Sequence, residues 1–380
     1  MSTHHVQYIR NRLLETARQT LEGLIDQRLG IDDTPQAARF ERHEEIYRSH
    51  RVKLTLPQPE ALETALPPDQ ILAVIADNPI RASELERAAA LQLYRLRGEL
   101  YLQRRRDLDR LIEQHLLQLE AQRRGVTVEA LEQSLSEVEP VTDVEIADFV
   151  SRERAVGRTV EDPERVRPYL TFQKRFQRRT SLLQAIRAET QIRIDLRPPA
   201  RPRLPVDARG GVALGSAAGP IIVAYTNYAC ALCRATHTEI DRLLAARDPP
   251  RIVLRDFVHD QVTMQAAALV RCAARNARAP SMRRYLLQHE PPRTRDVWFS
   301  ARELQSIAPV AGMQVTELRA CIDAPDIRGQ IEQDTRAAMR LGFDRPPAFI
   351  AAGVPLSGMQ SAEQLSDALS GKPDPALLVR

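Results

Sequence analysis

The stretch Tyr225–Cys233, with the sequence YTNYACALC, constrains the fold more than any other part of the chain. The apolar run Pro220–Ala224 precedes it and is typical of a buried strand. The segment Arg234–Ala246 follows it with apolar residues at helical spacing, which predicts an amphipathic helix. A strand followed at once by a helix places Cys230 and Cys233 on the first helical turn.

Two cysteines on the first turn of a helix have a predictable chemistry. Unpaired backbone N–H groups and the positive end of the helix dipole favour a thiolate there, so we expect a lowered pKa for Cys230. Cys233 lies one turn further on, within reach of a mixed disulfide formed on Cys230. The pattern therefore predicts thiol–disulfide exchange, with Cys230 as the catalytic nucleophile and Cys233 as the resolving cysteine.

A Cys-x-x-Cys pair is also half of a common zinc site. Such a site needs a second pair of ligands at short spacing. The two other cysteines, Cys272 and Cys321, stand alone in helical-looking segments. His237 is near the pair in sequence, and we expect it on the helix surface rather than as a ligand. We predict no metal site and no other cofactor.

Residues 212–371 as a whole resemble the DsbA-type thiol–disulfide oxidoreductases, which have a thioredoxin fold. The matching segments follow the family's order and are the strand and active-site helix at 221–233, a strand ending in Arg-Asp-Phe at 251–257, the start of a helical insertion at 266–275, the cis-proline loop at 346–350 and the closing strand and turn at 354–358. The resemblance implies that Pro347 is the cis-proline facing the cysteines. It also implies that Pro346 and Pro347 contact the substrate.

Several positions depart from the family pattern. Ala231 stands where the family usually has proline, and Ala231 and Leu232 offer the thiolate no cation, so we expect a milder oxidant than the strongest family members. Ala224 and Asn227 occupy positions that often carry acidic residues, which removes a carboxylate that could relay a proton. Pro346 has no backbone N–H to donate to an extended substrate.

Cys272 and Cys321 have two interpretations. They could be free buried thiols, which are common in proteins. They could instead form a structural disulfide that clamps the helical insertion, an arrangement that some members of the family show. We favour the disulfide, because the resemblance implies an oxidising compartment.

The chain before residue 198 has the apolar periodicity of helices, at 6–29, 36–51, 91–122, 128–135, 144–152 and 165–188. The segments Val52–Leu56 and Ile71–Ile75 are expected to be extended. Clusters of proline around 57–68 and 198–205 indicate linkers. Residues 21–29 resemble 108–116, and residues 52–56 resemble 192–196, which suggests an abbreviated copy and a complete copy of one unit.

The unit at 70–197 resembles the N-terminal chaperone region of SurA-type periplasmic folding factors. The resemblance rests on the Asn78-Pro79-Ile80 entry, a Leu-Ile-Glu-Gln helix, Arg123–Thr127 and Pro140–Asp143. No parvulin-like segment accompanies it. The alternative is a plain helical spacer that holds the redox domain in an oligomer.

We therefore expect an α+β multidomain protein, with an all-helical N-terminal region followed by an α/β thioredoxin-like fold with a helical insertion. The expected parts are a helical segment with a proline-rich linker at 1–69, a SurA-like helical domain at 70–197, a proline-rich linker at 198–211, and a DsbA-like domain at 212–380 with its insertion at about 261–340.

Charge and hydropathy bear on which partners the protein binds and on where in the cell it works. The 380 residues carry 54 Lys and Arg against 50 Asp and Glu, and the two signs interleave along helices, so we expect solvated helix faces rather than a nucleic-acid site. No stretch approaches the about 20 apolar residues of a membrane span. The resemblance implies a periplasmic or otherwise extracytoplasmic location, although residues 1–5 lack the apolar core of a signal peptide. Either the sequence starts downstream of a signal or the protein works elsewhere.

The expected function is thiol–disulfide exchange on the cysteines of unfolded or exported proteins, with a further redox partner that recycles the cysteine pair. The helical region is expected to bind clients or to form a homo-oligomer. The alternative is a non-catalytic chaperone or scaffold whose thioredoxin-like domain has drifted. A third option is a carrier that binds a soft metal ion such as Cu(I) through Cys230 and Cys233.

Overall fold

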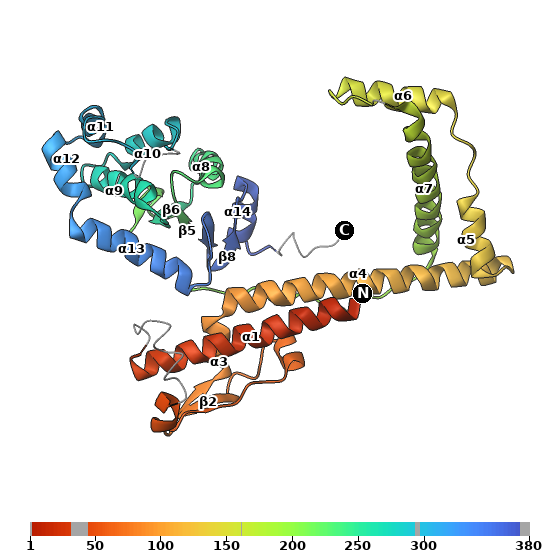
Figure 1. Cartoon of the computed structure of the whole chain (residues 1–380), viewed down its shortest axis with the longest axis horizontal. Helices are drawn as coiled ribbons and strands as arrows, with labels where there is room; N and C mark the ends of the chain where they lie inside the picture. The colour runs from red at the N-terminus through yellow and green to blue at the C-terminus, as the bar shows by residue number, and fades with distance from the viewer. Residues whose placement is uncertain (1, 32–44, 161, 293–296, 373–380) are drawn as a thin grey trace. The chain divides into compact units, whose positions relative to one another are not determined.

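The computed structural model describes residues 2–31, 45–160, 162–292 and 297–372. They form two compact units, the first made of residues 3–100 together with the chain from Pro198 onward and the second of residues 101–197 (Figure 1). The first unit holds both sheets of the described chain, and the second is helical. The α+β class expected from the sequence is confirmed.

The described residues of the second unit form helices and the segments that connect them. Its elements are the later part of α4 (Ala90–Arg124), α5 (Val128–Ser136), α6 (Asp143–Ala155), the 3-10 helix η2 (Pro163–Arg165) and α7 (Val166–Glu189). Two small cores hold them, one around Leu117, Leu131 and Ile186 and one around Ile146 and Leu170. The three helices expected after residue 125 are therefore confirmed.

The N-terminal part of the first unit is helical with one small sheet. Its elements are α1 (Ser2–Leu29), β1 (Lys53–Leu54), the 3-10 helix η1 (Pro59–Glu63), β2 (Ile71–Ile75), β3 (Asn78–Arg81), α3 (Ala82–Ala88) and the start of α4. The strands pair antiparallel in the order β1-β2-β3. Helix α1 buries Ile9, Leu13, Ala17, Leu21 and Ile25, which recur every four residues along one face.

The structure of this region differs from two of the expectations. The N-terminal region is helical as expected, but not entirely, since the two extended segments expected at 52–56 and 71–75 contain β1 and β2. Residues 191–196, all of them described, form no strand and so differ from 52–56, which they resemble in sequence. The helix expected over 36–51 lies mostly outside the described residues.

The second sheet of the first unit has five strands in the order β4-β6-β5-β7-β8. Their bounds are β4 (Val212–Gly215), β5 (Ile221–Thr226), β6 (Arg251–Asp256), β7 (Ala348–Ala351) and β8 (Val354–Ser357). Strand β5 lies at the centre, parallel to β6 and antiparallel to β7. The carboxyl ends of β5 and β6 therefore meet at one edge, where Thr226 is paired with Asp256.

Alternate residues of β5 point into two different cores. Ile222 and Ala224 pack with helices α8 (Ala231–Leu244) and α14 (Ala362–Leu369). Val223 and Tyr225 pack on the opposite face against Ala338 of α13 (Pro325–Arg340). Because both faces are covered, β5 is apolar at every position up to Tyr225, as its sequence indicated.

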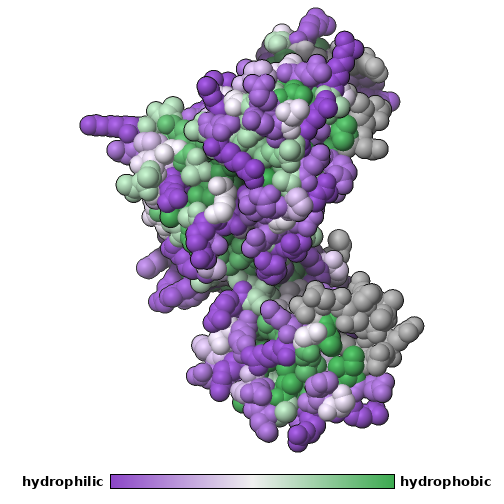
Figure 2. All heavy atoms as spheres, turned by 90° about the vertical axis from the view of Figure 1, so that its left-hand side faces the viewer, coloured by the Kyte–Doolittle hydropathy of each residue, from purple (hydrophilic) through white to green (hydrophobic). Residues whose placement is uncertain are grey.

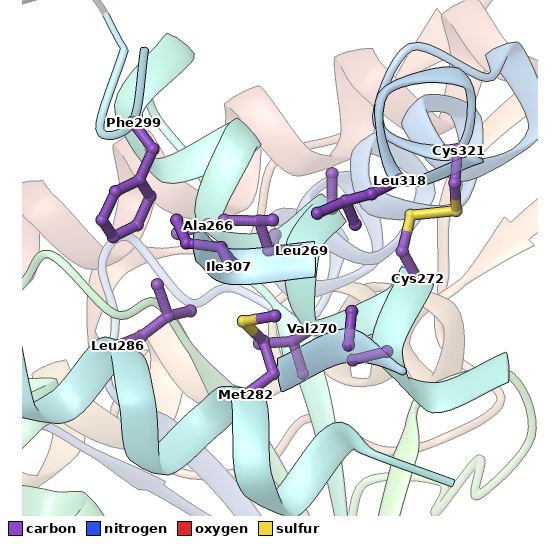
Figure 3. Close-up of a cluster of buried hydrophobic side chains, with 14 of the residues drawn as sticks. Ala266, Leu269, Val270, Cys272, Met282, Leu286, Phe299, Ile307, Leu318 and Cys321 are labelled. Carbon is purple, nitrogen blue, oxygen red and sulfur yellow. A yellow bond between two sulfur atoms is a disulfide. The ribbon is translucent and has the colours of Figure 1, made fainter. Parts of the chain in front are cut away.

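In the described part of the chain, five helices lie between β6 and β7 and share one core. They are α9 (Gln261–Arg275), α10 (Ala279–Gln288), α11 (Leu304–Ala311), α12 (Val315–Ile322) and α13. Figure 3 shows their shared core, in which Leu269 of α9, Leu286 of α10 and Leu318 of α12 are fully buried. A disulfide between Cys272 and Cys321 joins α9 to α12 in this core, with a Cα–Cα distance of 6.0 Å.

The surface mixes polar and apolar residues. On the face drawn in Figure 2, hydrophilic side chains surround small apolar patches. In the described part of the chain, no helix combines the length and apolar character that crossing a bilayer requires.

Candidate active site at the start of helix α8

The loop from β5 to α8 is held by the side chain of Asn227, which is buried. Its Oδ1 accepts the backbone N–H groups of Ala229, at 3.1 Å, and of Cys230, at 2.7 Å. Its Nδ2 donates to the carbonyl of Phe257, just after β6, at 3.1 Å. Asn227 thus links the cysteine loop to the neighbouring strand end.

Cys230 occupies the N-cap position of α8, and its side chain is partly exposed. The sulfur accepts the backbone N–H of Cys233 at 3.3 Å. The pKa of Cys230 is lowered to about 6, mainly by a hydrogen bond from the Cys233 side chain, with help from the backbone N–H groups of Cys233 and Leu232 and against the effect of burial. At neutral pH Cys230 is therefore mostly a thiolate, which is the nucleophilic form.

Cys233 differs from Cys230 in its burial and in the direction of its pKa shift. Its side chain is fully buried, and neither cysteine is in a disulfide. The hydrogen bond to Cys230, followed by burial, raises the pKa of Cys233. The pair thus combines a reactive, accessible sulfur with a protected one directly behind it.

The cis-proline loop lies beside Cys230. The Pro346–Pro347 peptide bond is cis. The carbonyl oxygen of Pro346 lies 3.9 Å from the Cys230 sulfur, and the carbonyl of Pro347 accepts the N–H of Gly358 at 2.8 Å. The structure therefore brings together Cys230, Cys233 and Pro346, while Cys272 and Cys321 lie apart from them in the core of the helical insertion.

The expectation that His237 lies on the surface of its helix is wrong, because the side chain is fully buried. Its ring stacks on that of Tyr228, with centroids 5.2 Å apart and planes at 6°. Burial, followed by the charges of Arg283 and Arg234, lowers the pKa of His237 to about 3. His237 is therefore neutral. One turn of helix separates it from Cys233, and this spacing could have marked it as a core residue.

Neither a zinc site nor another metal site is formed by the described residues, since no three His, Cys, Asp or Glu side chains gather in a way that could hold an ion. The zinc alternative lacks its second pair of ligands in this part of the chain.

A buried cluster of four charges lies behind the sheet and was not foreseen. Arg255 of β6 donates to Asp334 of α13 at 2.6 Å, and Arg271 of α9 binds both Asp334 and Asp256. All four residues are more than nine-tenths buried. Burial raises the pKa of Asp256 to about 6, although Arg271 lies beside it. The cluster joins the sheet to the helical insertion.

Comparison with known proteins finds similarity in the C-terminal part of the chain. Residues 207–370 match the model of the thioredoxin family, and this segment is less than half of the chain. No curated protein matches the chain. Solved structures that are similar share low identity with it. A thioredoxin-like oxidoreductase from Silicibacter pomeroyi is 22% identical, with a TM-score of 0.39, and the match covers 43% of this chain and 92% of that one.

Two further solved structures match a similar share of this chain. The thiol–disulfide exchange protein alpha-DsbA2 from Wolbachia pipientis is 18% identical, with a TM-score of 0.37, over 42% of this chain and 85% of that one. The catalytic domain of Proteus mirabilis ScsC is 13% identical, with a TM-score of 0.37, over 46% of this chain and 92% of that one. The match to the thioredoxin model identifies residues 207–370 as a thioredoxin-like domain, with the cysteine pair at the start of its helix α8.

Proposed function

We propose that the protein is a thiol–disulfide oxidoreductase that acts on protein cysteines, with Cys230 as its nucleophile. The observation that carries the proposal is the N-cap position of Cys230, where hydrogen bonds lower the pKa of its thiol to about 6. The second cysteine, Cys233, is fully buried behind it. A purely structural disulfide needs no such difference between its two sulfurs.

The proposed reaction has two exchange steps. The Cys230 thiolate attacks one sulfur of a substrate disulfide, a Cys230–substrate disulfide forms, and the first substrate thiolate leaves. Cys233 then attacks the Cys230 sulfur, the Cys230–Cys233 disulfide forms, and the second substrate thiolate leaves with the proton that Cys233 gave up. The substrate is reduced by two electrons and the pair is oxidised. The same steps in reverse oxidise a substrate, and the potential of the recycling partner sets the direction.

Pro346 and Pro347 form the proposed substrate-binding edge. The Pro346 carbonyl lies next to the attacking sulfur, where it could accept a hydrogen bond from substrate backbone, whereas Pro346 itself donates none. Leu232, in the dipeptide between the cysteines, is 52% exposed and offers an apolar contact beside Cys230. These groups suit an extended, partly apolar segment of an unfolded protein.

Substitution of the nucleophile tests the proposal. In the Cys230→Ser protein, reduction of a disulfide-bonded test protein by dithiothreitol should be no faster than without protein, whereas the wild type should accelerate it. The Asp326→Ala protein is the control, because it removes only an exposed ion pair with Arg275 that is not part of the proposed site. Equal activity of the wild type and the Cys230→Ser protein would overturn the proposal.

An extracytoplasmic location is part of the proposal. Its support is the Cys272–Cys321 disulfide, since disulfides persist in oxidising compartments. The substrates would then be exported proteins, and a separate redox partner would recycle the Cys230–Cys233 pair.

A client-binding role for the helical unit 101–197 is a second proposal, and one observation favours it. On α7, Phe172 is 64% exposed and Phe176 is 63% exposed, one turn apart with stacked rings, and Tyr169 of the preceding turn is 47% exposed. Large apolar side chains that gather on a surface mark sites of protein contact. The resemblance to SurA-type chaperones stays a prediction, as does self-association through this unit.

A further inference from the structure

A cavity of about 210 Å³ lies against the five-stranded sheet, apart from the cysteine pair. Val223 and Tyr225 of β5 line it, and both side chains pack on the α13 face of the sheet. Helix α8, which begins at the cysteines, packs with Ile222 and Ala224 on the opposite face. The cavity is therefore separated from the proposed exchange site by the sheet itself.

The register of the sheet builds this cavity. Val223 is paired with Ile350 of β7, and Tyr225 is paired with Arg255 of β6. Paired residues of neighbouring strands point to the same face, so the sheet provides an apolar floor with two polar side chains beside it. The other lining residues come from the end of α13 and from the segment before β4, and they are Pro205, Asp207, Ala337, Arg340 and Leu341.

The hydroxyl of Tyr225 is unusual for a buried tyrosine. The residue is 4% exposed, and its ring packs against Phe343 with the centroids 5.8 Å apart. Buried tyrosine hydroxyls usually have a hydrogen-bond partner, yet no residue in the described part of the chain is bonded to this one. Burial is the main cause that raises the pKa of Tyr225, so the hydroxyl keeps its proton at neutral pH and can donate a hydrogen bond into the cavity.

Most charged groups around the cavity are already paired. Arg255 donates to Asp334 at 2.6 Å and to the carbonyl of Asp207 at 3.1 Å. The carboxylate of Asp207 accepts from the Nε of Arg209 at 3.0 Å. Arg340, the last residue of α13, is exposed and has no ion-pair partner among the residues that the structure describes. Of the two cations that line the cavity, Arg340 is therefore the one available to a ligand.

We propose that this cavity binds a small carboxylic acid with an apolar body. Its carboxylate accepts hydrogen bonds from the Tyr225 hydroxyl and the Arg340 guanidinium, and its body lies on Val223 and Ile350. Both polar groups are donors and one is charged, which favours an anion over a neutral acceptor. A cavity of about 150 Å³ holds benzene, whereas drug-sized ligands need about 300 Å³ or more. The volume of about 210 Å³ thus suits one aromatic ring with its carboxylate.

Fluorine NMR of para-fluorobenzoate, added to the full-length protein at pH 7 and constant ionic strength, tests the proposal. We expect saturable binding with a dissociation constant of about 1 mM or below. Para-fluorobenzamide has a similar shape and no charge, and it should bind about tenfold more weakly. Absence of saturable binding, or equal binding of the acid and the amide, would overturn the proposal. The result is independent of exchange activity, because neither Cys230 nor Cys233 lines the cavity.

Tyr225→Phe removes the hydroxyl and keeps the ring. We expect para-fluorobenzoate to bind about tenfold more weakly to this variant, the value of one hydrogen bond to a charged group. Wild-type affinity for the acid in Tyr225→Phe would contradict the role of the hydroxyl and overturn the proposal.

Arg340→Met removes the charge and keeps most of the apolar stem. Because the side chain is exposed and its charge is screened, we expect the affinity for the acid to fall about fivefold. Arg336→Met is the matched control, since Arg336 is exposed on the same helix, pairs with Glu332 at 3.4 Å and does not line the cavity. This control should bind the acid as the wild type does. Equal weakening in the two variants would show a response to net charge alone and would overturn the proposal.

Ala337→Leu places a larger side chain in the cavity and leaves both donors in place. We expect it to abolish saturable binding of the acid, which assigns the binding to this cavity, and circular dichroism shows that the variant is folded. It also keeps the proposal testable if Tyr225→Phe does not fold. Binding by Ala337→Leu with wild-type affinity would place the acid elsewhere and overturn the proposal.

Discussion

The Cys230 thiol has an environment that distinguishes it from an ordinary cysteine. Three hydrogen bonds reach it from residues of the first turn of α8, and together they outweigh the effect of burial on its pKa. A thiolate in this position persists at pH values where a free cysteine, with a pKa of about 8.5, is protonated. The reactivity of the site is therefore local in origin.

The pH dependence of alkylation tests this account at the residue scale. Since only the thiolate reacts, the rate of iodoacetamide modification of Cys230 in the reduced protein should rise with pH through about 6 and level off by pH 7.5. Cys230→Ser should remove this phase, which assigns it. A midpoint between pH 8 and 9 would show that Cys230 is not activated.

The structural role of Asn227 is not visible in the sequence, where the residue only replaces an acid. In the structure its amide links two backbone N–H groups of the cysteine loop to the carbonyl of Phe257. Asn227→Ala removes the partner of these part-buried N–H groups and of the buried Phe257 carbonyl, so we expect the free energy of unfolding to fall by about 1–3 kcal/mol in urea denaturation. Asn227→Asp keeps the acceptor and should lose less. Equal losses in the two variants would assign the effect to the Nδ2 donor alone.

At the scale of elements, the buried charges fix the sheet against the helical insertion. Asp334 of α13 is bound by Arg255 of β6 and Arg271 of α9. Removing one partner of a buried pair leaves an uncompensated charge, so Asp334→Ala should lower the free energy of unfolding by about 3–5 kcal/mol. Urea denaturation measures the loss.

The exposed ion pair between Arg275 and Asp326, on the same two helices, provides the matched control. Its side chains are 47% and 58% exposed, so Asp326→Ala should change the free energy of unfolding by no more than about 1 kcal/mol. Similar losses for Asp326→Ala and Asp334→Ala would contradict the account of the cluster.

The sequence predicted those elements whose signals are local. The apolar run before Cys230 and the helical periodicity after it identified β5 and α8, because burial of each face leaves a mark on successive residues. The charge cluster left no such mark. Arg255 and Asp334 are 79 residues apart, and either one alone reads as a surface charge. The burial of His237 escaped notice for the same reason, since its partner Arg283 comes from another helix.

At the scale of the whole molecule, the chain contains a thioredoxin-like domain and a helical unit, and the proposed functions give them separate tasks. Phe172→Ser combined with Phe176→Ser should weaken suppression of client aggregation severalfold, because the exposed rings of α7 are removed. Light scattering of an aggregating test protein measures this. Thiol–disulfide exchange should be unchanged in the same variant.

Cys230→Ser gives the complementary control, with exchange lost and suppression of aggregation retained. If the double phenylalanine variant suppressed aggregation as well as the wild type, α7 would not be the client-binding surface. The unit would then fit the alternative of a spacer within an oligomer.

The most direct measurement concerns which sulfur meets the substrate. The Cys233→Ser protein, in which the second exchange step is blocked, is mixed with glutathione disulfide at pH 7, and the adduct is located by peptide mass spectrometry. The account predicts a stable adduct on Cys230 that approaches one per chain. The Cys230→Ser protein should form little adduct on the buried Cys233. Absence of an adduct on Cys230, or equal labelling of the two cysteines in the two variants, would contradict the central claim that Cys230 is the nucleophile.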